Sequence, residues 1–85
     1  MKGITFRLRW REELEAIADD KKLIFECTMG TLHVYFPSKQ CWQANIPIWA
    51  KEKWDIYLEA CSDWCRNNKI PISIVDNAVV YEEAI

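Results

Sequence analysis

Glycine is scarce in this chain, and the cysteines lack the spacing that metal sites usually require. Only Gly3 and Gly30 occur among the 85 residues, so no glycine-rich loop is available to cradle a phosphate group. The four cysteines include no Cys-x-x-Cys pair, which is the spacing typical of thiolate zinc sites. We therefore expect no cofactor and no metal, and no group of residues identifies a catalytic site.

The chain also has no long apolar run. None of its segments approaches the roughly 20 apolar residues that a membrane-spanning helix needs. The first residues lead into an alternating segment instead of the apolar stretch of a signal peptide. We expect a cytoplasmic protein without a membrane partner, and in that compartment disulfides are rare. The cysteines are then expected to be reduced thiols: Cys27, Cys41, Cys61 and Cys65.

An excess of positive charge is missing as well. The formal net charge is −2, whereas domains that bind phosphate backbones without sequence preference are usually basic. What the chain does have is apolar and aromatic content, since 51% of the residues are hydrophobic and five are tryptophan. Such a composition supports a dense core and argues against disorder. We expect residues 1–85 to form one α+β domain.

Residues 4–11 alternate strictly between bulky apolar and polar side chains. This period of two is typical of a strand with one buried face and one solvated face. It predicts that the isoleucine, phenylalanine, leucine and tryptophan of the segment point inward. Arg7 and Arg9 are then expected together on the solvated side.

The period changes after this strand. Trp10, Leu14, Ile17 and Ala18 recur at helical spacing with glutamates between them, which predicts a short helix over about residues 11–21. Because a helix of that length is marginal by itself, it would depend on packing against a sheet.

Two further strands are predicted over residues 23–28 and 31–36. Between them, Gly30 permits the positive φ that a two-residue hairpin turn needs. That turn would place Glu26 opposite His33. Pro37 has no backbone N–H for the ladder and is expected to end the second strand.

The second half of the chain contains the main helix, predicted from about residue 47 to residue 67. Its apolar stripe includes Cys61 and Cys65, which we expect to pack in the core as small hydrophobic residues. Residues 40–46 fit either an edge strand or a loop that carries Trp42 into the core. The remaining expected elements are a strand at 72–75, a turn at 76–77 and a short strand over 78–82.

The resulting order is strand, helix, strand, strand, helix, strand. This is the order of the ferredoxin-like βαββαβ sandwich, a two-layer α+β fold whose two helices cover one face of an antiparallel sheet. Here it would carry an extra short hairpin or edge strand. A meander of strands covered by one long helix is the alternative. Because such folds host many unrelated activities, the fold alone assigns no function.

The uncovered face of the sheet is the candidate site. Arg7, Arg9, His33 and Tyr35 are predicted to lie there, with Trp49 as a separate partner-binding anchor on the helix side. Arginine and tyrosine are enriched in protein interfaces, and arginines near aromatic rings also suit single-stranded nucleic acids. A solvated face with cross-strand ion pairs would explain the same residues without any partner.

The sequence therefore favours a small, tryptophan-rich, non-catalytic interaction or regulatory module. It would bind a protein partner, or a second copy of itself as a homodimer, through the uncovered sheet face. Single-stranded RNA or DNA binding on the same face is the first alternative. A small enzyme that uses Glu26 and His33 as an acid–base pair is the second.

Overall fold

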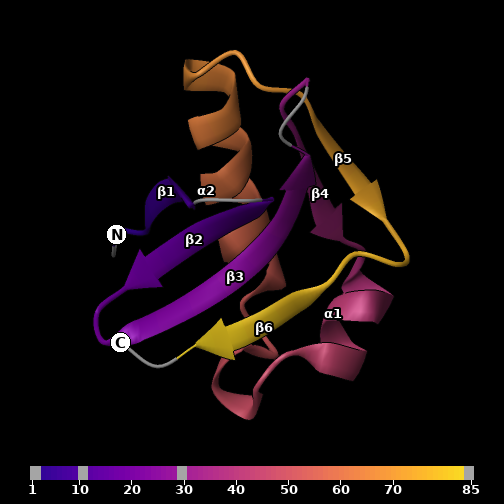
Figure 1. The fold of residues 1–85 in the computed structure, drawn as a ribbon. Helices are drawn as coiled ribbons and strands as arrows, with labels where there is room; N and C mark the ends of the chain where they lie inside the picture. Colours follow the sequence, from indigo (N-terminus) through magenta and orange to yellow (C-terminus); the bar gives the residue numbers. More distant parts are fainter. Residues whose placement is uncertain (1–2, 10–11, 29–30, 84–85) are drawn as a thin grey trace.

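The computed structural model describes residues 3–9, 12–28 and 31–83. Within these ranges the chain forms four strands, a helical segment and two further strands (Figure 1). The elements in chain order are β1 (Thr5–Arg9), β2 (Glu13–Ala18), β3 (Lys21–Thr28), β4 (His33–Pro37), α1 (Lys39–Asn45), the 3-10 turn η1 (Ile48–Ala50), α2 (Trp54–Asn67), β5 (Ile72–Val75) and β6 (Val80–Glu83).

The strands form one mixed six-stranded sheet with the path β1-β2-β3-β4-β5. Among the described strands, only β4 and β5 run parallel to each other, and the helical segment supplies the long crossover that a parallel connection needs. The central strand β3 pairs with β2 along one side. Along its other side it pairs with β6 over 22–25 and with β4 over 26–28. Because β6 and β4 share this side of β3 and then diverge, the sheet splits there (Figure 1).

The α+β class is confirmed, but the βαββαβ order is not the one that this chain adopts. The helix predicted over 11–21 is wrong, because residues 13–18 form β2. Two neighbours stabilise that strand, with Leu14 opposite Leu8 on one side and opposite Phe25 on the other. Asp19 adopts a positive φ of 57° in the tight turn between β2 and β3, a conformation that aspartate tolerates better than most residues. Strands β1 to β4 pair consecutively and antiparallel, which is the meander named in the alternative prediction.

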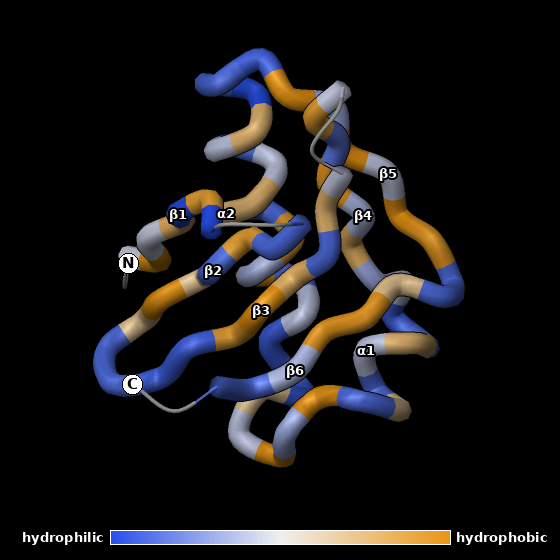
Figure 2. Tube along the Cα trace, viewed as in Figure 1, coloured by the Kyte–Doolittle hydropathy of each residue, from blue (hydrophilic) through white to orange (hydrophobic). Residues whose placement is uncertain are grey.

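The core lies between the sheet and the helical segment. Leu14, Ala16, Leu23 and Phe25 alternate along β2 and β3 and belong to this core, whereas the residues between them, Glu15 and Ile24, are buried on the opposite face of the sheet. Figure 2 shows polar and apolar residues alternating at the start of β2 and a continuous apolar stretch in the middle of β3. In β1, Phe6 is buried as predicted and packs on the helix, whereas Leu8 is 38% exposed near the edge of the sheet. The expected inward position of Trp10 lies outside the described residues.

Trp42 occupies the centre of this core and is fully buried. It lies on α1, so residues 40–46 are neither an edge strand nor a loop. The hydroxyl oxygen of Ser38 caps this helix by accepting a hydrogen bond from the backbone N–H of Cys41. The indole N–H of Trp42 in turn donates to the carbonyl oxygen of Ala50 at 2.8 Å, which ties α1 to η1.

The long helix ends at Asn67 as predicted but begins at Trp54, seven residues later than expected from residue 47. Pro47 instead precedes the short 3-10 turn η1. Cys61 and Cys65 are fully buried, which confirms their core packing, and burial raises the pKa of the Cys27 thiol on β3. None of the described helices combines the length and the apolar content needed to cross a membrane.

The hairpin of β3 and β4 has a different register from the predicted one. Glu26 pairs with Tyr35 and Thr28 pairs with His33, so the connection is longer than two residues. The shift is two residues, and a shift of two leaves every side chain on its expected face. The predicted turn at Gly30 itself lies outside the described residues.

Candidate functional site

The helical segment leaves one face of the sheet uncovered, and we call this the open face. In Figure 1, α2 passes behind β2 and β3, so the open face is turned toward the viewer. The strand residues that alternate with the core residues lie on it. It has three parts: a charged cluster on β1 and β2, an aromatic pair on β4, and a groove between them.

The charged cluster surrounds Glu15, a carboxylate that is only 4% exposed. The guanidinium of Arg7 donates to Glu15 Oε1 through Nε at 3.1 Å and through Nη2 at 2.8 Å. The other Glu15 oxygen lies 3.4 Å from Arg9 Nε and 3.7 Å from Lys22 Nζ. Cross-strand pairing explains this arrangement, because Arg7 lies directly opposite Glu15 in the ladder.

Two more carboxylates complete the charged cluster. Arg9 donates to Glu83 at 2.6 Å and lies 3.3 Å from Glu13. The cluster thus holds three cations (Arg7, Arg9, Lys22) and three carboxylates (Glu13, Glu15, Glu83), with no net charge. It offers no excess of positive charge to a phosphate backbone.

Acid should weaken this cluster through Glu83. The hydrogen bond from Arg9 holds the pKa of Glu83 below its ordinary value of 4.5. A carboxylate whose pKa is lower in the folded state stabilises the fold above its unfolded pKa, and that stabilisation is lost as the pH falls through the folded pKa. We expect the free energy of unfolding to decline below about pH 4.5, and to decline less steeply in Glu83→Gln. Urea denaturation of both proteins between pH 7 and pH 3 measures this, and identical slopes would contradict it.

The aromatic pair consists of His33 and Tyr35, whose rings stack with centroids 4.7 Å apart at 18°. The His33 Nε2 atom shares a 2.7 Å hydrogen bond with the hydroxyl of Ser73 on β5. Since the pair lies three strands away from Arg7 and Arg9, roughly 14 Å separate the two groups across the sheet. The open face therefore holds these four predicted residues at two separate places.

The expected pairing of Glu26 with His33 is wrong. Glu26 lies opposite Tyr35, and its carboxylate accepts a hydrogen bond from the backbone N–H of Val79 at 3.2 Å. His33 pairs instead with Thr28 across the strands and with Ser73 through its ring. The acid–base pair that the enzyme alternative required is therefore not formed.

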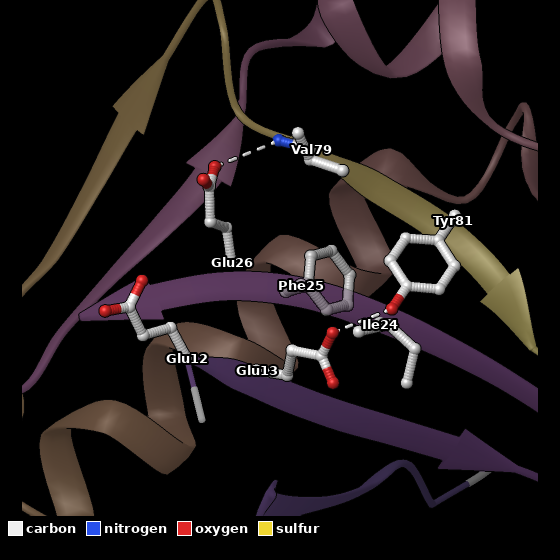
Figure 3. A pocket seen from close by; sticks show the side chains of 7 residues that line it. All are labelled: Glu12, Glu13, Ile24, Phe25, Glu26, Val79 and Tyr81. Atoms are coloured by element: carbon white, nitrogen blue, oxygen red, sulfur yellow. Dashed lines mark hydrogen bonds between the residues drawn. The ribbon is translucent and has the colours of Figure 1, made fainter. Parts of the chain in front are cut away.

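The groove lies where β6 and β4 diverge from β3, and it has a volume of about 600 Å³. Figure 3 shows its lining, in which apolar side chains form the floor and carboxylates stand around them. The lining residues are Glu12, Glu13, Ile24, Phe25, Glu26, Val79 and Tyr81. We call this the acidic groove.

The polar side chains of the acidic groove are three carboxylates and the neutral hydroxyl of Tyr81. The hydroxyl of Tyr81 donates to Glu13 Oε2 at 2.9 Å, and desolvation together with this hydrogen bond raises the pKa of Tyr81. Glu13 also forms an ion pair with Arg9, which does not line the groove. Among the described residues, no lysine or arginine lines the groove or forms an ion pair with Glu12 or Glu26. The groove is therefore a negative, partly apolar depression whose charge is incompletely balanced.

Trp49 does not belong to the open face. It lies on η1, half-buried against the core, and the ammonium of Lys21 stands 5.7 Å from its ring centroid. Lys21 has the same strand parity as the core residues Leu23 and Phe25, so Trp49 is on the helix-covered side. The Trp49 indole N–H is buried without a hydrogen-bond partner in the described part of the chain. Its main contacts are thus with the core.

The sequence analysis missed the acidic groove and the buried Glu15. Both omissions have one cause, the helix predicted over 11–21, which scattered Glu12, Glu13 and Glu15 over a helical surface. The missed signal was the alternation of Glu13, Leu14, Glu15 and Ala16, which fits a strand as well as a helix. The sequence predicts a strand that contains Tyr81, but it does not predict that this strand pairs with β3.

The described residues contain no group of three or more potential metal ligands. No family model, no curated protein and no solved structure matches this chain.

Proposed function

We propose that this protein is a non-catalytic interaction module that binds a protein partner through its open face. The observation that carries the proposal is the acidic groove, which joins an apolar floor to the carboxylates of Glu12 and Glu26, neither of which has an ion-pair partner among the described residues. Pockets that combine apolar area with a few oriented polar groups are typical binding sites. The aromatic pair of His33 and Tyr35 and the exposed part of Arg7 flank the groove and suit the rim of such an interface.

The chemistry of the acidic groove selects the partner. A lysine or arginine side chain can lay its aliphatic stem along Val79, which is 54% exposed, and direct its charge to Glu12 and Glu26. The ring of Tyr81, which is 38% exposed, adds a surface over which a cation is attracted. The proposed partner is therefore a protein segment that carries lysine or arginine.

This proposal differs in its charge requirement from single-stranded nucleic-acid binding. A nucleic acid would need an excess of cations along its path, whereas the cations of the charged cluster are matched by carboxylates. The carboxylates of the acidic groove would repel phosphates. We therefore do not propose a nucleic-acid partner.

Titration calorimetry with a short capped peptide of glycine, lysine and arginine tests the proposal. We expect saturable binding at low salt, and weaker binding in Glu26→Gln by about fivefold, which corresponds to roughly 1 kcal/mol for a partly exposed ion pair. Glutamine keeps an oxygen that can accept the hydrogen bond from Val79, so the loop is preserved.

Glu59→Gln provides the matched control, because it removes the same charge from an exposed position on α2. It should leave the affinity unchanged. A peptide with glutamine in place of lysine and arginine should not bind. If both variants weaken binding equally, the attraction is a general effect of net charge, and the proposed role of the acidic groove is wrong.

A further inference from the structure

Three strands of the sheet have a free edge among the described residues. β1 pairs only with β2, β6 pairs only with β3, and β5 pairs only with β4. A free edge presents unpaired backbone N–H and C=O groups that can pair with another strand. Soluble proteins usually protect such edges with charged side chains.

The edges of β1 and β6 carry that protection, and the edge of β5 does not. β1 contains Arg7 and Arg9, and β6 contains Glu82 and Glu83. The sequence of β5 is Ile-Ser-Ile-Val, without a charged residue. Ile74 is 51% exposed although it is an isoleucine in a strand. In Figure 1, β5 forms the border of the molecule, and no described element lies beyond it.

The register of β5 defines which of its backbone groups face outward. The N–H of Val34 donates to the carbonyl of Pro71, and the N–H of Ser38 donates to the carbonyl of Val75. In a parallel ladder, residues of alternate parity bond the neighbouring strand. The N–H and C=O groups of Ile72 and Ile74 therefore point away from the sheet and are available to a further strand.

We propose that this edge binds a second copy of the chain, so that two β5 strands pair antiparallel around a two-fold axis. Antiparallel pairing is self-complementary in charge, because Lys69 precedes β5 and Asp76 follows it. Each lysine is then brought toward the aspartate end of the other strand. A parallel pairing would instead place lysine beside lysine and aspartate beside aspartate. An isologous contact of this kind closes after two copies.

The outward groups fix the register of the pair. Ile72 of each copy lies opposite Ile74 of the other and exchanges both backbone hydrogen bonds with it. Ser73 then lies at the two-fold axis, opposite its own counterpart. The exposed Ile74 side chain is covered by isoleucine from the second copy. Because no residue of β5 lines the acidic groove, the groove of each copy remains accessible in the dimer.

The mass in solution tests the proposal first. Sedimentation of the wild-type chain should approach twice the 10.1 kDa of one chain as concentration rises to several hundred micromolar. Ile74→Lys should return the mass to one chain, because a charge on the edge disfavours strand pairing. Ile56→Lys is the matched control, since Ile56 on α2 is 45% exposed, and it should keep the dimer. Circular dichroism checks that both variants remain folded.

Cross-linking tests the register independently. Two antiparallel residues that face each other without hydrogen bonds lie about 4.5 Å apart at Cα, within the range that a disulfide spans. Ser73→Cys should therefore form a covalent dimer when diamide oxidises the two thiols to a disulfide. Thr5→Cys on the β1 edge and the wild-type chain should remain monomeric on a non-reducing gel.

A monomeric wild-type chain at the highest concentration overturns the proposal. A dimer that survives Ile74→Lys, or one that Ser73→Cys does not trap, also overturns it and assigns the contact to another surface. Binding of the basic peptide is measured separately, so the interaction-module proposal stands or fails without regard to the dimer.

Discussion

Replacing Trp42 with alanine should lower the free energy of unfolding by about 3–5 kcal/mol, the range for truncating a large buried aromatic residue. Trp42 is fully buried and contacts three other rings, with centroid distances of 6.1 Å to Phe25, 5.7 Å to Phe36 and 5.7 Å to Tyr57. It thus joins α1 to β3, β4 and α2 at one point. Alanine would leave a cavity that these rings cannot fill without moving. Urea denaturation followed by circular dichroism measures the loss.

Trp42→Phe separates packing from hydrogen bonding. Phenylalanine keeps most of the apolar contact but cannot donate to the carbonyl of Ala50, so we expect a smaller loss of about 1–2 kcal/mol. Trp54 provides a control, because it is only half-buried and its indole donates to the carbonyl of Pro37. Trp54→Ala should cost less than Trp42→Ala. The reverse ranking would place the centre of the core elsewhere.

Removing the carboxylate of Glu15 should have the second largest effect. Glu15→Ala should destabilise the protein by about 1–3 kcal/mol, because Arg9 and Lys22 would stay beside the sheet with one partner fewer. The cost stays below that of a fully buried pair, since the Arg7 side chain is 67% exposed and can be hydrated by water.

Glu15→Gln and Glu59→Gln distinguish charge from shape. Glutamine at position 15 preserves the shape of the side chain but carries no charge, so we expect an intermediate loss. The same change at the exposed Glu59 should stay within about 0.5 kcal/mol of the wild type. Urea midpoints at pH 7 provide the comparison. Equal stability of Glu15→Gln and the wild type would mean that the charge of Glu15 contributes nothing.

Strands with an unambiguous pattern could be predicted from the sequence. The alternation in β1 placed Phe6 inward and both arginines outward, and the apolar runs of β3 and β4 were located with their correct buried faces. These predictions succeed because a period of two has one structural interpretation once one face is buried.

The β2 segment could not be predicted, because its residues fit two periods. Leu14 and Ala18 are four residues apart, as on a helix, while Leu14 and Ala16 alternate with glutamates, as in a strand. The strand is stabilised by partners on both sides, and those partners are contributed by distant parts of the chain. The acidic groove depends on the same pairing and on the contact of β6 with β3, so it could not be inferred locally.

The hairpin register shows a different limit. A two-residue turn was predicted from the position of Gly30, and the pairing of Thr28 with His33 requires a longer connection. The faces of the strands were unaffected, but the neighbours of Glu26 and His33 changed. Predicting the contacts of the candidate site therefore requires the correct strand register, whereas predicting the fold class does not.

Chemical-shift mapping with the lysine- and arginine-containing peptide tests the central claim most directly, because it reports where the ligand binds. Adding the peptide to ¹⁵N-labelled protein should shift the amide signals of residues 12–13, 24–26 and 79–81, which line the acidic groove. The signals of α2 should stay in place. Shifts confined to α2 and η1, or no shifts at a saturating concentration, would contradict recognition on the open face.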